Sequence, residues 1–352
     1  MSQRTFRVAL AGWGLAGRYF HAPFIAATPG LELAAVATSR EPEPDLFPGL
    51  RTVATFDALL AVPDLDVVVI ATPNALHVAQ ARAALQAGHH VVVEKPVAPA
   101  SGVWAELAAF AAQQGRLLVP FHNRRWDGDF RTVQALLADG RLGAVHFFAS
   151  SWPRYRPEVK ARGDWKATAD PTAGVLYDLG AHLVDQALVL FGVPQRVAAR
   201  VERLRPGAVN DDWMRITLDF PPSAANPPVT ALLEVDSLNA MPGPRFHVRG
   251  QDATYAKSGL DPQEEALRRG EMPGGAAWGG EPDGAWGTLT GRDGSAERVP
   301  TLPGDYGAFY RGLYDALNSG TPPPVSAADA TLQLRVLEAA RHAAETGDIR
   351  SL

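Results

Sequence analysis

The feature that most constrains the fold is residues 6–17, FRVALAGWGLAG. Its first half alternates apolar residues with small or polar ones, as a short strand does, and then runs into a G-x-G-x-x-G turn. The first glycine permits a tight turn, the second lets the backbone approach a pyrophosphate, and the third lets a following helix pack on the strand. The segment predicts the first turn of a βαβ unit that binds a dinucleotide. The residues of the predicted phosphate-binding turn are Gly12, Gly14, Leu15, Ala16 and Gly17.

The first third of the chain alternates predicted strands with predicted helices. The helix at 76–87 is expected to end at Gly88, and the helix at 101–114 is expected to begin with Ser101 as its N-cap. Because strands that alternate with helices form parallel, doubly wound sheets, residues 1–121 are predicted to form a Rossmann domain. After the glycine turn, further strands are predicted at 31–38, 66–70, 90–93 and 117–120, and further helices at 18–27 and 56–61.

The remainder of the chain has a different pattern. Several consecutive strand-like stretches without intervening helices predict a largely antiparallel sheet, so residues 122–352 are expected to form an α+β domain. Residues 270–291 are rich in Gly, Pro and Trp and are expected to be irregular. The predicted fold class is therefore α/β, with a parallel Rossmann sheet followed by a mostly antiparallel one. The strand-like stretches are 144–151, 194–205, 212–220, 229–239 and 245–249, and late helices are expected at 305–319 and 327–345.

Composition narrows the classes of function. A chain of 352 residues is long enough for two domains. Its formal net charge of −5 argues against nucleic acid or an anionic membrane as the main partner. The chain has no cysteine, which excludes disulfides, thiolate metal sites and cysteine nucleophiles. No apolar run long enough for a membrane span and no signal-peptide layout is present, so we expect a cytoplasmic location.

Polar residues gather where three of the predicted parallel strands end. In such sheets ligands bind outside the carboxyl ends of the strands, so these residues are expected to face a cofactor. Two alternatives remain open: Lys95 as a solvated surface lysine, and His77 as a residue that hydrogen-bonds locally. The candidate cofactor-binding residues are Ala71, Thr72, Pro73, Asn74, His77, Glu94, Lys95, Pro96, Asn123 and Arg124.

The end of the second predicted strand bears on which nicotinamide is used. An acidic residue there would bind the adenosine ribose and disfavour a 2′-phosphate. The chain instead has Thr38, Ser39 and Arg40, a hydroxyl and a guanidinium that suit a phosphate. We therefore expect NADP to be preferred over NAD, the alternative being that Arg40 is an ordinary loop charge.

The second informative stretch is residues 174–192, GVLYDLGAHLVDQALVLFG. Asp178, His182 and Asp185 have the spacing i, i+4, i+7, so on a helix they share one face among many leucines. A buried Asp and His one turn apart are costly unless they satisfy each other or carry out chemistry. The alternative is that Asp178 caps the helix and His182 is a hydrogen-bonded core histidine.

Three motifs in this order resemble one family along essentially the whole chain: GWGLAG, EKP at 94–96, and the D-x-x-x-H of Asp178 and His182. The chain is similar to the glucose–fructose oxidoreductase/inositol dehydrogenase (Gfo/Idh/MocA) family. Residues 121–130, 154–162 and 259–273 further resemble a branch of NADP-linked scyllo-inositol dehydrogenases. The glycine-rich lead-in before the Asp is thinner here, with only Ala173 and Gly174.

The resemblance implies a Rossmann domain followed by a domain with a large open sheet, whose exposed face commonly mediates dimers or tetramers. It implies that Lys95, Asp178 and His182 form the catalytic set. His182 would remove the hydroxyl proton, Lys95 would stabilise the charge on that oxygen, and Asp178 would orient His182 or contact a neighbouring hydroxyl. No metal is needed. The resemblance also adds Trp165 as a cofactor contact, and the expected substrate contacts are Lys95, Asn123, Tyr155, Asp178 and His182. For Tyr155 the alternative is a solvent-exposed basic loop, with Arg154 and Arg156.

We therefore expect an NAD(P)-dependent oxidoreductase that transfers hydride between nicotinamide and a secondary alcohol or ketone. The expected substrate is a small polyol, sugar or cyclitol, and the expected assembly is a homodimer or homotetramer. Two alternatives to this dehydrogenase belong to other classes of protein. One is a redox-assisted glycosidase that retains its nucleotide, and the other is a non-catalytic nucleotide-binding redox sensor.

Overall fold

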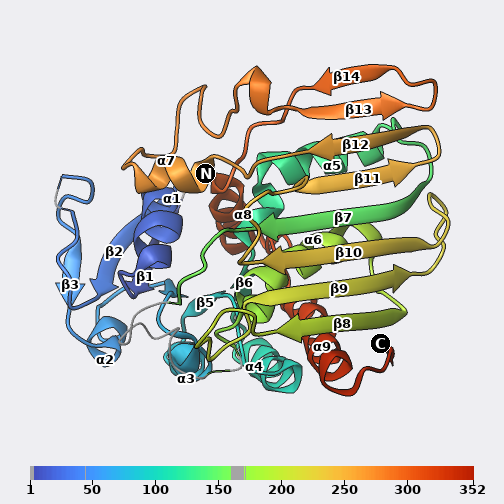
Figure 1. Cartoon of the computed structure of the whole chain (residues 1–352). Helices are drawn as coiled ribbons and strands as arrows, with labels where there is room; N and C mark the ends of the chain where they lie inside the picture. The colour runs from blue at the N-terminus through green and yellow to red at the C-terminus, as the bar shows by residue number, and fades with distance from the viewer. Residues whose placement is uncertain (1–3, 44, 160–169, 171) are drawn as a thin grey trace. The chain divides into compact units, whose positions relative to one another are not determined.

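The computed structural model describes residues 4–43, 45–159, 170 and 172–352, and Figure 1 shows their arrangement into elements. The chain divides into two compact units, each described below by itself. Neither is one continuous stretch of sequence. Unit 1 comprises Met1–Trp126, Pro262–Trp278 and Asp305–Thr331, and unit 2 comprises Asp127–Asp261, Gly279–Gly304 and Leu332–Leu352.

Unit 1 contains a parallel sheet of six strands in the order β3-β2-β1-β4-β5-β6. Every neighbouring pair in it is parallel, which confirms the predicted doubly wound sheet. All four residues of β4 are buried, because strands in the middle of such a sheet are covered on both faces. The strands are β1 (Phe6–Ala11), β2 (Leu31–Ala37), β3 (Arg51–Val53), β4 (Val67–Ile70), β5 (His90–Glu94) and β6 (Leu118–Phe121).

The helices predicted within residues 1–121 lie at the expected positions, with one correction. Ser101 is not an N-cap: the amide of Trp104 donates to the carbonyl of Ala100, which makes Ala100 the cap and Ser101 the first helical residue. Gly88 follows α3 at φ +87°, as expected for a residue that ends a helix. The helical elements are η1 (Ala16–His21), α1 (Ala22–Ala27), α2 (Phe56–Leu60), η2 (Asn74–Leu76), α3 (His77–Gln86), α4 (Ser101–Gln113), η3 (Asn123–Trp126), α7 (Gln263–Arg268) and α8 (Gly307–Ser319).

An aromatic cluster joins α8 to the Rossmann sheet. The Phe121 ring, at the end of β6, lies edge-on to Phe309 with centroids 4.7 Å apart. Tyr310 and Tyr306 of the same late segment contact His21 and Phe24, which follow the glycine turn. These rings are buried and together cover a large apolar area. The contact between His21 and Tyr310 thus brings residues 289 positions apart into one core.

Unit 2 is built on a sheet whose described strands have the order β14-β13-β12-β11-β7-β10-β9-β8-β15. Only the β7–β10 pair among them is parallel, which confirms the mostly antiparallel prediction. The strands are β7 (Val145–Pro153), β8 (Arg196–Glu202), β9 (Trp213–Phe220), β10 (Val229–Asp236), β11 (Phe246–Gly250), β12 (Ala253–Lys257), β13 (Gly287–Gly291), β14 (Ala296–Val299) and β15 (Arg350–Ser351).

The expectation of an irregular segment over 270–291 is wrong at its end. After the short helix η6 (Asp283–Ala285), Gly287–Gly291 forms β13. A Cβ on Gly287 would collide with the Tyr255 ring of the neighbouring strand. Glycine here permits close side-chain approach within a sheet, so its presence did not mark a loop.

One face of the unit 2 sheet is covered by helices. Residues of β9 and β10 alternate between buried and more exposed, and η5 (Leu176–Gly180) and α6 (Ala181–Phe191) contact the buried face. The other α-helices described in this unit are α5 (Gly128–Ala138) and most of α9 (Ala327–Thr346). No helix in the described part of the chain has the length and apolar character needed to cross a membrane.

Candidate active site

The glycine turn has the geometry that its sequence predicts. Gly12 has φ +102°, a region that side chains rarely adopt, and a Cβ there would lie 2.5 Å from the carbonyl oxygen of Ala71. A Cβ on Gly17 would collide with the carbonyl of Gly12. Gly14 differs, because a Cβ built on it has no atom within 4 Å. Backbone facing open space at this position fits the pyrophosphate of a dinucleotide.

The loop after β4 is held by α3. The Thr72 hydroxyl donates to Gln80 Oε1 at 2.6 Å. His77, the first residue of α3, is 1 % exposed. Its Nε2 lies 2.8 Å from the carbonyl oxygen of Thr72, and its Nδ1 lies 2.9 Å from that of Pro96 in the loop after β5. Both ring nitrogens of His77 thus lie within hydrogen-bond distance of backbone carbonyl oxygens in these two loops.

The residue that ends β5, Glu94, is the centre of a buried polar network. Its Oε1 lies 3.1 Å from His21 Nε2, and its Oε2 accepts the backbone N–H of Lys95 at 2.9 Å. Tyr310 is the third member of this hydrogen-bond network, and its hydroxyl lies 2.5 Å from His21 Nδ1. Burial by itself raises the pKa of Glu94, but the hydrogen bond and charge of His21, with Lys95 and His77, lower that pKa below its usual value. Glu94 is therefore a buried carboxylate.

After β6, Arg124 serves as an anchor within unit 1. It is 7 % exposed, donates to the Tyr306 hydroxyl at 2.9 Å, and donates to Glu264 Oε2 at 2.5 Å. Burial raises the pKa of Glu264, whereas Arg124 and then Arg268 lower it, with a net decrease. Asn123, beside it in η3, is 4 % exposed. Arg124 therefore holds α7 against this loop.

The end of β2 lies beside the glycine turn. The amide of Arg40 donates to the Thr38 hydroxyl at 2.9 Å, and its guanidinium reaches the carbonyl of Trp13 at 3.3 Å. Trp13 is the residue between the first two glycines of the turn. Arg40 thus places positive charge at the turn, while Ser39 stays exposed next to it. Arg18, on η1, forms an ion pair with Glu43 in the same neighbourhood.

In unit 2, Asp178 and His182 lie on two different kinds of helix. Asp178 belongs to the π-helical turn η5, and His182 to α6, so the prediction of one regular helix is wrong at its start. Asp178 does not cap this segment. Asp211 does so, because its Oδ2 accepts the N–H of Leu176 at 2.8 Å. His182 and Asp185 are 5 % and 2 % exposed, and Asp178 is less buried.

A buried arginine lies close to this helix. Arg245, 2 % exposed, donates to Gln186 Oε1 at 2.9 Å and to the Ser150 hydroxyl. Its guanidinium lies 5.1 Å from the Trp152 ring, and the His182 ring lies 6.2 Å from the same ring. The sequence offered no signal for this arrangement, because an arginine between Pro244 and Phe246 resembles an ordinary residue at a strand start.

The other predicted substrate and cofactor contacts have different outcomes. Tyr155 is 62 % exposed and pairs with Leu238 in an isolated bridge beyond β7. Trp165 lies outside the described residues, as do residues 160–162 of the stretch that resembles the scyllo-inositol branch. No cluster of three or more His, Asp or Glu that could hold a metal ion occurs among the residues described.

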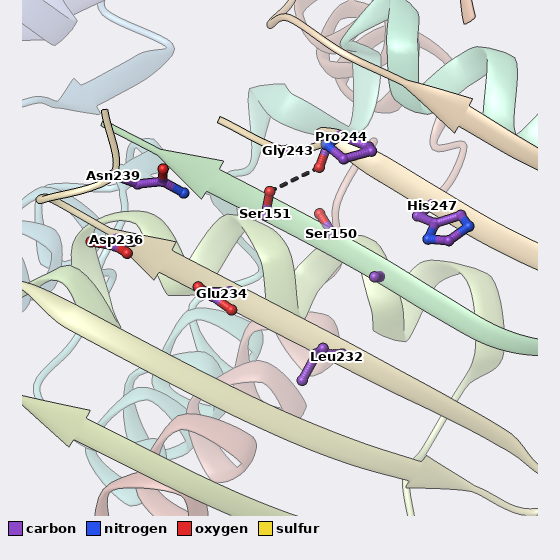
Figure 2. Close-up of a pocket in the computed structure, with 10 residues that line it drawn as sticks. Ser150, Ser151, Leu232, Glu234, Asp236, Asn239, Gly243, Pro244 and His247 are labelled. Atoms are coloured by element: carbon purple, nitrogen blue, oxygen red, sulfur yellow. Dashed lines mark hydrogen bonds between the residues drawn. The ribbon is translucent and has the colours of Figure 1, made fainter. Parts of the chain in front are cut away.

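The open face of the unit 2 sheet has a hollow, and Figure 2 shows the side chains of β7, β10 and β11 that line it. Its polar groups include Glu234, Asp236 and His247, and Ser151 donates to the Pro244 carbonyl at 2.9 Å. None of the predicted catalytic residues lines it. The lining residues are Ala149, Ser150, Ser151, Leu232, Glu234, Asp236, Asn239, Gly243, Pro244 and His247.

Comparison with known proteins agrees with this architecture. Residues 6–122 match the model of the Gfo/Idh/MocA oxidoreductase family NAD-binding Rossmann fold, and residues 134–350 match that family's C-terminal alpha/beta domain. The chain belongs to the Gfo/Idh/MocA oxidoreductase family, as the three sequence motifs predicted.

Several relatives match nearly the full length. The uncharacterised oxidoreductase YdgJ of Escherichia coli is 40 % identical over 95 % of each chain. The scyllo-inositol 2-dehydrogenase (NADP+) IolW of Bacillus subtilis is 36 % identical over 96 % of this chain and 93 % of that one. The solved structure of the oxidoreductase yvaA from Bacillus subtilis superposes with a TM-score of 0.93, at 34 % identity, covering 100 % of this chain and 99 % of that one. These relatives do not favour the glycosidase or sensor alternatives.

Proposed function

We propose that this protein transfers hydride between NADP and a secondary alcohol or ketone of a cyclitol or sugar. The observation that carries the proposal is the similarity along almost the whole chain to a scyllo-inositol 2-dehydrogenase that uses NADP. A bound nicotinamide supplies the hydride acceptor for alcohol oxidation and the donor for ketone reduction.

The chemistry of the chain's own residues follows from the reaction. Oxidation requires removal of the hydroxyl proton, and an imidazole is suited to accept it near neutral pH, so His182 is the proposed base. Lys95 would donate a hydrogen bond to the same oxygen and stabilise its developing negative charge. Asp178 would orient His182 or bind a neighbouring hydroxyl of the substrate.

The preference for NADP is proposed to come from Ser39 and Arg40. Support comes from the Arg40 guanidinium, which reaches the glycine turn through the Trp13 carbonyl. An arginine at this point offers a planar set of donors to a 2′-phosphate. Replacement of Arg40 by Ala should therefore reduce the ratio of kcat/KM for NADP to that for NAD, with activity on NAD retained.

We further propose that the open face of the unit 2 sheet carries the contact between copies of the chain, as a homodimer or homotetramer. The hollow in Figure 2 and the alternating exposure of β9 and β10 support this assignment. Light scattering of the wild type and of Leu232→Arg, which places a charge in the hollow, tests it. A smaller assembly in the variant is the expected result.

The test of the activity is the absorbance of reduced nicotinamide over a panel of scyllo-inositol, myo-inositol, glucose and xylose, each with NADP and NAD. Turnover of an inositol with NADP preferred is expected. Lys95→Ala and His182→Ala should each lower kcat by about 10²–10⁴-fold while the nucleotide still binds. Undiminished turnover in either variant would remove that residue from the catalytic set.

A further inference from the structure

The hydrogen-bond partners of His77 constrain its protonation. Both ring nitrogens lie within hydrogen-bond distance of backbone carbonyl oxygens, Thr72 at 2.8 Å and Pro96 at 2.9 Å. A carbonyl oxygen can only accept a hydrogen bond. A neutral imidazole has one N–H and one lone pair, so either neutral tautomer would set a lone pair against a carbonyl oxygen in a site that is 1 % exposed.

We propose that His77 is an imidazolium that donates to both carbonyls and so ties together the loops that follow β4 and β5. The two loops come from neighbouring strands of the sheet and contain Thr72 and Lys95. His77 is thus a positioning residue. It holds the backbone that presents those side chains, and it need not touch the nucleotide itself.

A buried cation requires a nearby negative charge, and Glu94 supplies one. Glu94 ends β5, is 8 % exposed, and accepts hydrogen bonds from His21 and from the Lys95 backbone. The charge of His77 is among the causes that lower the pKa of Glu94, after burial, which raises it, and the stronger contribution of His21. His77 therefore shares the carboxylate of Glu94 with Lys95 and His21, whose charges also lower the pKa of Glu94.

Two other histidines of unit 1 show that the pattern at His77 is specific. His21 faces a carboxylate and the Tyr310 hydroxyl, and a hydroxyl can donate as well as accept, so these partners do not require two ring N–H groups. At His90, Nδ1 accepts the N–H of Leu117 at 3.0 Å, which requires a lone pair on that nitrogen. Burial, followed by the charge of Arg116, lowers the pKa of His90. His90 is therefore the matched neutral reference on the same strand that carries Glu94.

The first test is nuclear magnetic resonance of the full chain labelled with ¹⁵N-histidine at neutral pH. His77→Gln, or His77→Asn if the first does not fold, assigns the signals by their disappearance, and His90→Gln assigns the reference. We expect both ring nitrogens of His77 to be protonated and one ring nitrogen of His90 to be unprotonated. An unprotonated ring nitrogen at His77 would overturn the proposal, whatever reaction the protein catalyses.

The second test concerns the positioning role and rests on the proposed function. His77→Gln keeps an amide donor for one carbonyl and loses the other charge-assisted hydrogen bond. We expect Kd for NADPH to rise about tenfold, with a smaller change in His90→Gln. Unchanged NADPH affinity in His77→Gln would show that the histidine does not position the cofactor loops. Because NADPH binding is measured without substrate, a failed substrate panel leaves this test valid.

Discussion

The loops after β4 and β5 in unit 1 and the η5–α6 region of unit 2 satisfy their buried polar groups in different ways. In the first, His77 contacts backbone 5 and 19 residues away, and Glu94 contacts the amide of the next residue as well as His21, 73 residues away. In the second, Arg245 contacts Gln186 and Ser150 at separations of 59 and 95 residues. The loops after β4 and β5 combine contacts that are short in sequence with one from His21, whereas the polar contacts of Arg245 near His182 join only distant segments.

The two regions therefore differ in what a single substitution should disturb. A change at Gly14 should affect nucleotide binding before it affects folding, because a side chain there meets no protein atom within 4 Å. A change in the buried network around Arg245 should affect folding first, because several elements of unit 2 meet there. Three predictions test this difference, from the largest expected effect to the smallest.

Arg245→Met should destabilise the protein by about 3–5 kcal/mol, because it leaves the fully buried Asp129, whose Oδ2 lies 3.8 Å from Arg245 Nε, without its cation. Arg249→Met, an exposed arginine in β11, is the matched control and should change stability by less than about 0.5 kcal/mol. Urea unfolding measures both. Equal losses of stability in the two variants would contradict the prediction that the buried network around Arg245 stabilises unit 2.

Gly14→Ala should leave the melting temperature close to that of the wild type, because the added methyl group meets no protein atom within 4 Å. It should weaken NADPH binding by about 1–3 kcal/mol, through contact with the pyrophosphate. Gly102→Ala, in α4, also meets nothing within 4 Å and is the control for which NADPH affinity should not change. Calorimetric titration gives both affinities. Normal NADPH binding by Gly14→Ala would mean that the pyrophosphate lies elsewhere.

Glu94→Gln should change how stability depends on acid. The folded-state pKa of Glu94 is lowered, so the carboxylate contributes stability above its unfolded pKa near 4.5, and this contribution is lost as the pH falls through the lower folded pKa. The stability difference between wild type and variant should therefore be greatest near neutral pH and should shrink below about pH 4.5. Denaturant unfolding at several pH values measures it. A difference independent of pH would show that Glu94 is not ionised in the fold.

Much of unit 1 was predictable because its signals are local. The parallel sheet followed from strands alternating with helices, and the glycine turn followed from steric limits that act within a few residues, as the φ of Gly12 shows. The strand ends also predicted which polar residues lie in the loops after β4, β5 and β6. What those side chains bond to was not predictable, and Arg124 illustrates this, because its partner Glu264 lies 140 residues away.

The sequence by itself determined the family, the two kinds of sheet and the positions of the motif residues, since repeated local patterns and glycine spacing carry that information. Only the tertiary structure decided that residues 262–278 and 305–331 belong to the Rossmann unit, that Asp211 rather than Asp178 caps η5, and that Arg245 is buried near His182. The physical reason is that a buried polar group is stable wherever the folded chain brings a complementary partner, and that partner has no fixed spacing in the sequence.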